Sequence, residues 1–273
     1  MIATLPSVQL GYDDQGSGLP IVMLHGFPHD RALWSQQRTA LAPRVRCITP
    51  DLRGFGESST DGPYSMDQYA DDIVSLLDWL GVKRAVVCGL SMGGYIAMAM
   101  WRRYPDRIRG LVLCDTRAAA DTDTSRAARN EMIALAQSAG ASAVAAKQLP
   151  GMVGATTHAS RPEIVAMMRD MLERQSVAGI VGALEALRDR PDSGPTLASV
   201  SVPTLVMVGE EDVLTPESDA RAMIALLPVS TSARLERIPD AGHVSCVERP
   251  AAVTHALAEF LAGFPSDHEH RTR

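Results

Sequence analysis

One serine stands between glycines at the point where an apolar run changes to a helical pattern, at Gly89-Leu90-Ser91-Met92-Gly93. Glycine weakens helices and strands, so its presence on both sides of a serine indicates a backbone turn that other residues resist. This G-x-S-x-G pattern, with an apolar run before it and a helical stretch after it, is typical of a strained turn that exposes the serine hydroxyl above the end of a sheet. We therefore expect Ser91 to act as a nucleophile in acyl transfer.

A serine hydroxyl at its ordinary pKa is a weak nucleophile and needs a base, which in turn needs a group that orients it. Seven histidines are candidates for the base. His243 follows the last strand-like run, and Asp212 follows the strand-like run before it. Ligands of open parallel sheets bind at the C-terminal ends of the strands, so Ser91, His243 and Asp212 are expected at the same edge. Asp115, which ends an earlier strand-like run, is a second candidate for the orienting carboxylate.

Backbone amides are the expected stabilisers of the negative charge that forms on the attacked carbonyl oxygen. The N–H of Met92 lies at the start of a helix, where backbone donors have no acceptor within the helix. The loop after the first strand-like run contains Gly26, which lets the chain turn so that the N–H of Phe27 faces the same point. Met92 and Phe27 are therefore predicted to form an oxyanion hole. His25 is expected to pack beneath this loop, whereas His29 faces either the pocket or the interior.

Short apolar runs alternate with helical stretches along most of the chain. The apolar runs are continuous rather than alternating, which is typical of strands buried on both faces of a parallel sheet. Strands are predicted at residues 20–26, 45–51, 84–89, 108–115, 203–212 and 233–243, and helices at 31–42, 66–81, 217–228 and 251–264 and directly after Ser91. This order predicts an α/β fold with a doubly wound, mostly parallel sheet.

The alternation is interrupted between residues 117 and 193, where the pattern is almost wholly helical. Two sets of apolar residues recur there at helical spacing and predict at least two amphipathic helices. The first set comprises Ile164, Met167, Met168, Met171 and Leu172, and the second comprises Val177, Ile180, Val181 and Leu184. We therefore divide the chain into a core (1–116 and 196–264), a helical cap (117–195) and a polar tail (265–273).

Composition and charge argue against several classes of function. The 273 residues carry a formal net charge of −6 and contain no basic run that could follow a phosphate backbone, so a nucleic-acid partner is not expected. The chain opens without a signal-like segment and contains no long uncharged apolar stretch, so we expect a cytoplasmic protein without a membrane segment. The four cysteines form no C-x-x-C pair, so neither a zinc site nor disulfides are expected. Nothing in the sequence indicates an oligomeric state.

Five motifs in order resemble those of the α/β-hydrolase fold family, and the resemblance spans nearly the whole chain. They are HGFP (25–28), DLRGFGES (51–58), GLSMGG (89–94), GEEDVLTP (209–216) and AGHVSCVERP (241–250). The resemblance implies an α/β-hydrolase fold with a helical cap inserted after the sixth strand. It also implies that Ser91 is the nucleophile, that His243 is the base and then the acid, and that Asp212 orients it. Phe27 and Met92 then correspond to the oxyanion donors, and no metal or organic cofactor is implied.

Within that family, the motifs are most similar to small carboxylesterases and 3-oxoadipate enol-lactonase-like proteins, with cofactor-free haloperoxidases and perhydrolases close by. We therefore expect a serine hydrolase that cleaves small to medium carboxylic esters or lactones through an acyl-enzyme. Perhydrolysis, and ligand binding without catalysis, are the alternatives. An enol-lactone substrate carries a carboxylate, for which the candidate cationic partners are Arg117, Arg126, Arg129 and Arg188.

Two features of the sequence have a second interpretation. The strand, glycine and helix order around Ser91 also suits a nucleotide-binding turn, although the G-x-G-x-x-G pattern is missing. The methionines of the cap suit either a hydrophobic core or the lining of an acyl pocket, because their side chains are soft and adaptable. The candidate pocket residues are Met152, Met167, Met168, Met171 and His29.

Overall fold

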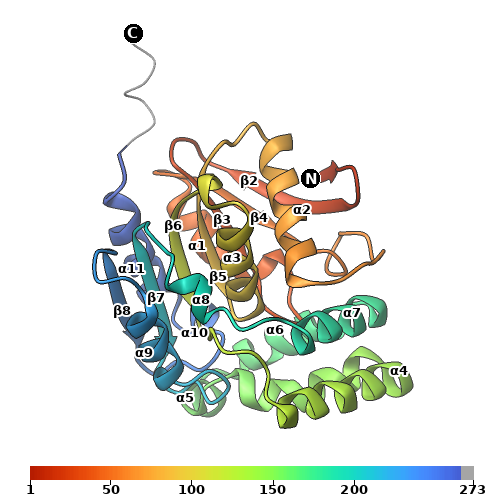
Figure 1. Ribbon diagram of the computed structural model, residues 1–273. Helices are drawn as coiled ribbons and strands as arrows, with labels where there is room; N and C mark the ends of the chain where they lie inside the picture. The colour runs from red at the N-terminus through yellow and green to blue at the C-terminus, as the bar shows by residue number, and fades with distance from the viewer. Residues whose placement is uncertain (266–273) are drawn as a thin grey trace.

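The computed structural model describes residues 1–265 and contains one sheet with helices on both faces (Figure 1). The strands are β1 (Ile2–Thr4), β2 (Gln9–Gln15), β3 (Pro20–Leu24), β4 (Arg46–Pro50), β5 (Ala85–Leu90), β6 (Ile108–Cys114), β7 (Thr204–Gly209) and β8 (Ala233–Ile238). Their order in the sheet is β1-β2-β4-β3-β5-β6-β7-β8. The pairs β1 with β2 and β2 with β4 are antiparallel, and the other neighbouring pairs are parallel. The predicted mostly parallel sheet is therefore confirmed.

The central strands are buried on both faces. Every residue of β3, β5 and β7 is buried. Successive side chains of a strand point to opposite faces of the sheet. Val22 and Leu24 accordingly join one hydrophobic cluster, whereas Ile21 and Met23 join another. Because both faces need apolar side chains, these strands appear in the sequence as continuous apolar runs.

Helices pack against both hydrophobic clusters. The helices α2 (Met66–Trp79), α3 (Met92–Arg103) and α9 (Glu217–Leu226) contribute to the cluster of Val22, and α1 (Ser35–Leu41) and α11 (Pro250–Ala262) contribute to the cluster of Ile21. Shorter helices are η1 (Arg31–Trp34), η2 (Pro105–Arg107), α8 (Gly194–Leu197) and α10 (Ser245–Glu248). The sheet is therefore doubly wound, as the alternation of strands and helices predicts.

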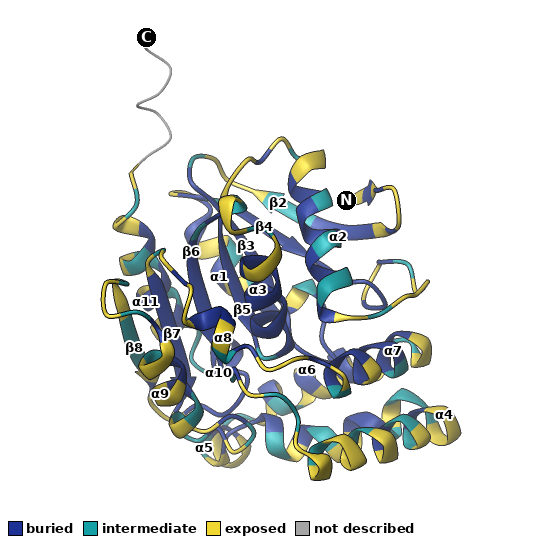
Figure 2. Ribbon diagram, in the orientation of Figure 1, coloured by how far each residue is buried: buried dark blue, intermediate teal, exposed yellow. Residues whose placement is uncertain are grey.

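Four helices inserted between β6 and β7 form the cap. They are α4 (Asp123–Met152), α5 (Ala155–Ser160), α6 (Pro162–Glu173) and α7 (Val177–Arg188), and they lie together beyond one end of the sheet in Figure 1. The helix α4 bends at Gly140, whose φ of 79° separates two helical stretches. Ile164 and Met168 of α6 and Ile180 and Leu184 of α7 are buried, while Figure 2 shows exposed residues along the outer side of α4. The two predicted amphipathic helices are therefore confirmed.

Two strands and two side chains differ from the expectations, one of the side chains being Val177 of α7, which is 38% exposed. The antiparallel strands β1 and β2 are absent from the predicted elements, because β2 carries Asp13, Asp14 and Gln15 on partly or fully exposed positions and has no clear apolar pattern. Helical spacing places Met167 on the buried face of α6, but its side chain is 38% exposed. Its neighbour Met168 takes the inward position and is fully buried.

Two parts of the predicted division of the chain remain, namely the exact boundaries of the cap and the polar tail. The chain leaves the sheet after Cys114 and returns to it at Thr204. The cap boundaries at residues 117 and 195 stay predictions. Residues 266–273 of the predicted polar tail lie outside the described residues. Among residues 1–265, no helix is both long and apolar enough to cross a membrane.

The cap approaches the core closely at two glycines. A methyl group at Gly179 of α7 would lie 1.9 Å from the carbonyl oxygen of Gly54, and one at Gly54 would lie 2.8 Å from the Cα of Gly179. Real side chains do not tolerate such distances from backbone atoms, so the contact depends on the absence of Cβ atoms. The helix α7 therefore rests directly on the backbone of the loop that follows β4.

Replacing Gly179 by alanine is expected to lower the free energy of unfolding by about 1–3 kcal/mol, because α7 must move away from Gly54. Urea denaturation measures the change. The matched control is Gly151→Ala in α4, where the added methyl would meet the Leu214 side chain at an ordinary 3.4 Å. This control is expected to be neutral or to stabilise by up to ~1 kcal/mol. Equal losses in both variants would contradict the proposed close contact.

Candidate active site

The turn between β5 and α3 holds Ser91 in a strained conformation, with φ 54° and ψ −113°. Such a positive φ is unfavourable for a residue with a side chain and persists when its surroundings hold it. The N–H of Ser91 donates to the carbonyl of Cys114 at 2.9 Å, and its own carbonyl accepts from the N–H of Gly94 at 2.9 Å and from the hydroxyl of Thr116 at 2.8 Å. The neighbouring strand and the helix start therefore fix the turn.

The glycines on both sides of Ser91 are required by close packing. A methyl at Gly89 would lie 2.1 Å from the carbonyl oxygen of Gly93, and one at Gly93 would lie 2.4 Å from the carbonyl oxygen of Leu24 in β3. The helix thus starts in contact with both its own strand and the neighbouring one. This is the collision that the sequence pattern predicts for any larger residue at positions 89 and 93.

The structure brings the three predicted polar side chains together. The Oγ of Ser91 lies 2.8 Å from Nε2 of His243, and Nδ1 of His243 lies 2.9 Å from Oδ2 of Asp212. His243 is 3% exposed and Asp212 is 5% exposed, so both hydrogen bonds are sheltered from water. Asp212 comes from the loop after β7 and His243 from the loop after β8. The arrangement is that of a nucleophile, a base and a group that orients the base.

Asp212 is held as a charged carboxylate. Burial alone would raise its pKa, but the charge of His243 and hydrogen bonds from His243 and Thr215 lower the pKa below its usual value. Its Oδ1 accepts from the N–H groups of Leu214 at 2.8 Å and Thr215 at 3.0 Å. Its Oδ2 also accepts from the Thr215 hydroxyl at 2.6 Å. Asp212 can therefore stabilise a proton on the imidazole of His243.

Asp115, the second candidate for the orienting carboxylate, has a different environment. It is fully buried, its φ is 45°, and it accepts hydrogen bonds from the N–H of Gly209 and the hydroxyl of Ser245. Burial, reinforced by the nearby charge of Asp212, raises the pKa of Asp115 well above its usual value. Its hydrogen bonds tie the ends of β6 and β7 to the loop of His243.

The predicted oxyanion loop is supported from below by His25. Its Nδ1 donates to the carbonyl of Gly26 at 2.8 Å, and its Nε2 accepts from the N–H of Leu52 at 2.9 Å. Burial lowers the pKa of His25, which keeps the ring neutral and suits one donor and one acceptor. Phe27 lines the same cavity as Ser91, and Met92 is the first residue of α3. His25 therefore has the structural place expected for it.

A cavity of about 180 Å³ lies over Ser91 and His243. This volume is small compared with the roughly 300–1,000 Å³ typical of sites for drug-sized ligands. Residues of both the core and the cap line it, among them Phe27, Tyr95, Arg117, Arg129, Gln148 and Met152. The cavity therefore suits a small substrate and offers it two guanidinium groups.

The predicted pocket residues are only partly found at this cavity. Met152 lines it. Met168 and Met171 are instead buried in the hydrophobic core, and Met167 is exposed, because the inner face of α6 packs on the core rather than on the cavity. His29 is fully buried and does not line the cavity. Burial, with the charges of His25 and His243, lowers the pKa of His29 to about 3, so it stays neutral near pH 7.

Several residues of the site are absent from the predictions. Tyr95 lies four residues after Ser91 on α3, so helical spacing places it on the same face and could have indicated it. Thr215 lies within the motif that contains Asp212, but its contact with His243 depends on the fold of that loop. Gln148 comes from the long helix α4 and carries no signal in the sequence.

Comparison with known proteins agrees with this geometry. The family model for the alpha/beta hydrolase fold matches residues 20–250. The structure is similar to that of a thermophilic esterase from Thermogutta terrifontis, described as malate bound, with a TM-score of 0.93, 37% identity and coverage of 96% of this chain and 98% of that one. The sequence is 31% identical to 3-oxoadipate enol-lactonase 2 from Acinetobacter baylyi over 85% of each chain. It is 30% identical to a putative non-heme bromoperoxidase from Mycobacterium tuberculosis over 93% of this chain and 98% of the other.

The chain therefore belongs to the α/β-hydrolase fold family. Within this family it falls in the group that resembles the 3-oxoadipate enol-lactonases.

Replacing Thr215 by valine is expected to move the acidic limb of the pH profile of kcat/KM to higher pH by roughly 0.5 unit. The hydroxyl donates to the same Asp212 oxygen that accepts from His243. The Thr215 hydrogen bond helps to lower the pKa of Asp212, so its loss raises that pKa and the carboxylate takes up a proton at higher pH. One hydrogen bond is worth ~1 kcal/mol, against ~1.4 kcal/mol per pH unit. Hydrolysis of p-nitrophenyl acetate across pH gives the profile.

The control for this prediction is Thr157→Val in the cap. Within residues 1–265 the buried hydroxyl of Thr157 has no hydrogen-bond partner, so its removal is expected to leave the profile unchanged. A Thr215 variant whose acidic limb coincides with that of the parent would show that this hydroxyl does not influence the base.

Proposed function

We propose that this protein is a serine hydrolase that cleaves small carboxylic esters or lactones through an acyl-enzyme intermediate. The observation that carries the proposal is the unbroken hydrogen-bond chain from Ser91 through His243 to Asp212 at the floor of a small cavity. This chain combines a nucleophile, a base and a charged orienting group, which acyl transfer requires. The likeness to enol-lactonases and esterases supports the same class of reaction.

The proposed reaction proceeds in two acyl transfers. Ser91 Oγ attacks the carbonyl carbon while His243 Nε2 takes its proton, and the oxyanion lies between the N–H groups of Phe27 and Met92. His243 then protonates the leaving oxygen as the ester C–O bond breaks. A water molecule, deprotonated by His243, attacks the acyl-enzyme, and the carboxylic acid is released as Ser91 regains its proton. Asp212 stays charged throughout and stabilises the imidazolium.

The substrate proposed for this site carries a carboxylate of its own. Of the four candidate arginines, Arg117 and Arg129 line the cavity, whereas Arg126 and Arg188 do not. The Nε of Arg129 donates to Asp121 at 3.1 Å, and the guanidinium of Arg117 donates to the carbonyl of Leu214. A guanidinium has five N–H donors, so these contacts orient the groups and retain donors for a carboxylate. The enol-lactonase and malate-bound relatives agree with an acidic substrate.

Perhydrolysis is the second candidate function, and the relative described as a putative non-heme bromoperoxidase favours it. In this reaction hydrogen peroxide replaces water as the acceptor of the acyl group, so the same Ser91 acyl-enzyme serves both outcomes. The ratio of peracid to acid, measured with an acetate ester in the presence of peroxide, distinguishes the two activities.

Replacing Ser91 by alanine is expected to reduce hydrolysis of p-nitrophenyl acetate or butyrate by more than about 10³-fold, because no nucleophile remains. The melting temperature is expected to stay the same or rise, since a strained functional residue is removed. Ser138→Ala, at an exposed hydroxyl on α4, is the control. Labelling of the parent by phenylmethylsulfonyl fluoride, absent in the Ser91 variant, adds a second measurement. Residual activity within about tenfold of the parent would refute the role of Ser91.

Replacing Arg129 by methionine is expected to lower kcat/KM for a monoester of a short dicarboxylic acid by about 10-fold or more, because a charged hydrogen bond is worth ~1.5–3 kcal/mol. Turnover of the neutral p-nitrophenyl acetate is expected to change little. Arg126→Met, one turn earlier on the exposed side of α4, is the matched control. Equal losses on acidic and neutral esters would argue against a carboxylate subsite.

A further inference from the structure

The oxyanion loop contains a carboxylate, that of Asp30, which is not part of the triad and does not line the cavity over Ser91. Asp30 follows Phe27 by three residues and is 4% exposed. Its Oδ1 accepts from the N–H of Ala32 at 3.0 Å, so it caps the first turn of η1. Because the loop is short, the position of Asp30 bears directly on the position of the Phe27 amide.

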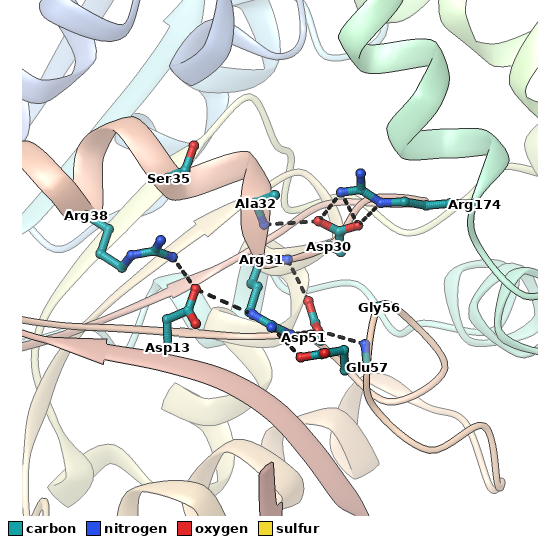
Figure 3. A pocket seen from close by; sticks show the side chains of 10 residues that line it. All are labelled: Asp13, Asp30, Arg31, Ala32, Ser35, Arg38, Asp51, Gly56, Glu57 and Arg174. Carbon is teal, nitrogen blue, oxygen red and sulfur yellow. Dashed lines mark hydrogen bonds and ion pairs between the residues drawn. The ribbon is translucent and has the colours of Figure 1, made fainter. Parts of the chain in front are cut away.

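The partners of Asp30 come from the cap. Arg174 makes a bidentate contact with Asp30. Its Nε donates to Oδ2 at 2.7 Å and its Nη2 donates to Oδ1 at 2.8 Å. The side-chain amide of Gln175 donates to Oδ2 at 3.0 Å. Figure 3 shows Arg174 reaching Asp30 from the end of α6, across the boundary between cap and core. Burial alone would raise the pKa of Asp30, but the hydrogen bond and charge of Arg174 lower it, so the carboxylate is charged.

The same turn of the cap also holds a second loop of the core. We name residues 174–176 the α6–α7 turn. The Oε1 of Gln175 accepts from the N–H of Gly56 at 3.1 Å, and the hydroxyl of Ser176 donates to the carbonyl of Gly54 at 3.1 Å. Gln175 is 5% exposed and also donates to the carbonyl of Met171 at 2.8 Å. The α6–α7 turn is therefore held by hydrogen bonds to the loop of Gly54 and to the carboxylate of Asp30.

The oxyanion loop is buried, and an open cavity adjoins it at Asp30. A cavity of about 450 Å³, visible in Figure 3, is lined by Asp30, Ala32, Gly56 and Arg174 among others. Between Phe27 and Asp30, the ring nitrogens of His29 have no hydrogen-bond partner among the described residues. On the far side of Asp30, the N–H of Arg31 donates to Asp51 at 2.7 Å. The contacts of Asp30 with Arg174 and Gln175 thus tie this loop to the cap through polar groups.

We infer that Asp30 is a positioning residue through which the α6–α7 turn fixes the loop of the Phe27 amide. The oxyanion hole then takes its final geometry when this turn is packed against the core. The inference rests on the proposed function, because it assigns the Phe27 amide to the transition state. The cap then completes the site as well as covering it.

This arrangement predicts a particular kinetic signature. An oxyanion donor acts mainly on the charge that develops in the transition state, so a displaced donor lowers kcat with little effect on KM. Displacements of about 1 Å near the chemistry cost up to ~10²-fold in rate. A cap that merely covers the cavity would instead change substrate binding.

The experiment compares Arg174→Met with Arg188→Met. Arg174 is half exposed, so its loss is compatible with folding. Arg188, at the end of α7, is the control because its partners among the described residues lie in the cap and include Asp189. With p-nitrophenyl butyrate, Arg174→Met is expected to lower kcat roughly 10-fold with KM within about 2-fold of the parent. Its affinity for a trifluoromethyl ketone, which forms a tetrahedral adduct with the serine, is expected to fall by a similar factor. Arg174→Lys, which keeps the charge but not the bidentate contact, is expected to recover part of the lost kcat.

The outcomes separate this inference from the proposed function. If the parent hydrolyses no ester or lactone, the proposed function fails and the inference fails with it. If the parent is active and Arg174→Met matches Arg188→Met in kcat and in ketone affinity, the proposed function stands and the positioning role is overturned. A loss confined to KM would also overturn it. A selective loss of kcat and ketone affinity, at melting temperatures equal to those of Arg188→Met, supports it.

Discussion

The hydrogen bond between Ser91 Oγ and His243 Nε2 joins two side chains that are 152 residues apart in the chain, and its 2.8 Å length depends on constraints at both ends. At one end, the positive φ of Ser91 turns the hydroxyl out of the sheet, and the bare backbones of Gly89 and Gly93 allow the helix to start against the strands. At the other end, Asp212 orients the imidazole, while the N–H of His243 donates to the carbonyl of Met152 in the cap at 3.0 Å. A shift at either end would break the contact between Ser91 and His243.

Three acidic side chains near this hydrogen bond have different tasks because their surroundings differ. Asp212 receives donors from its own loop and from His243, which keeps it charged. Asp115 has fewer donors and lies deeper, and burial together with the nearby charge of Asp212 raises its pKa. Glu248 is fully buried and accepts from the N–H groups of Gly154 and Gly242, each at 2.8 Å. Environment, rather than residue type, thus separates the orienting carboxylate from those that hold loops in place.

Two of the junctions between the cap and the core lie close to the proposed site. Glu248 links the start of α5 to the loop of His243, and the α6–α7 turn links Asp30 to the loop of Gly54. One junction lies next to the base, and the other lies next to the loop of Phe27. Because each junction uses charged or backbone hydrogen bonds in a largely buried setting, the cap is well placed to set the geometry of the site that it covers.

Local sequence patterns were sufficient for the parts of this protein that depend on neighbouring residues. Apolar runs predicted the largely buried strands β3 to β7, helical spacing predicted α6 and α7, and the glycines around Ser91 predicted the strained turn, since each signal arises within a few residues. The motif order was enough to single out Ser91 and His243 and to favour Asp212. Tertiary structure decided which of two acids faces His243, that Met152 lines the cavity while Met168 and Met171 do not, and that Arg117 and Arg129 reach it. The reason is physical: these outcomes depend on how the cap packs against the core, and packing joins side chains distant in the chain through distances that no local pattern records.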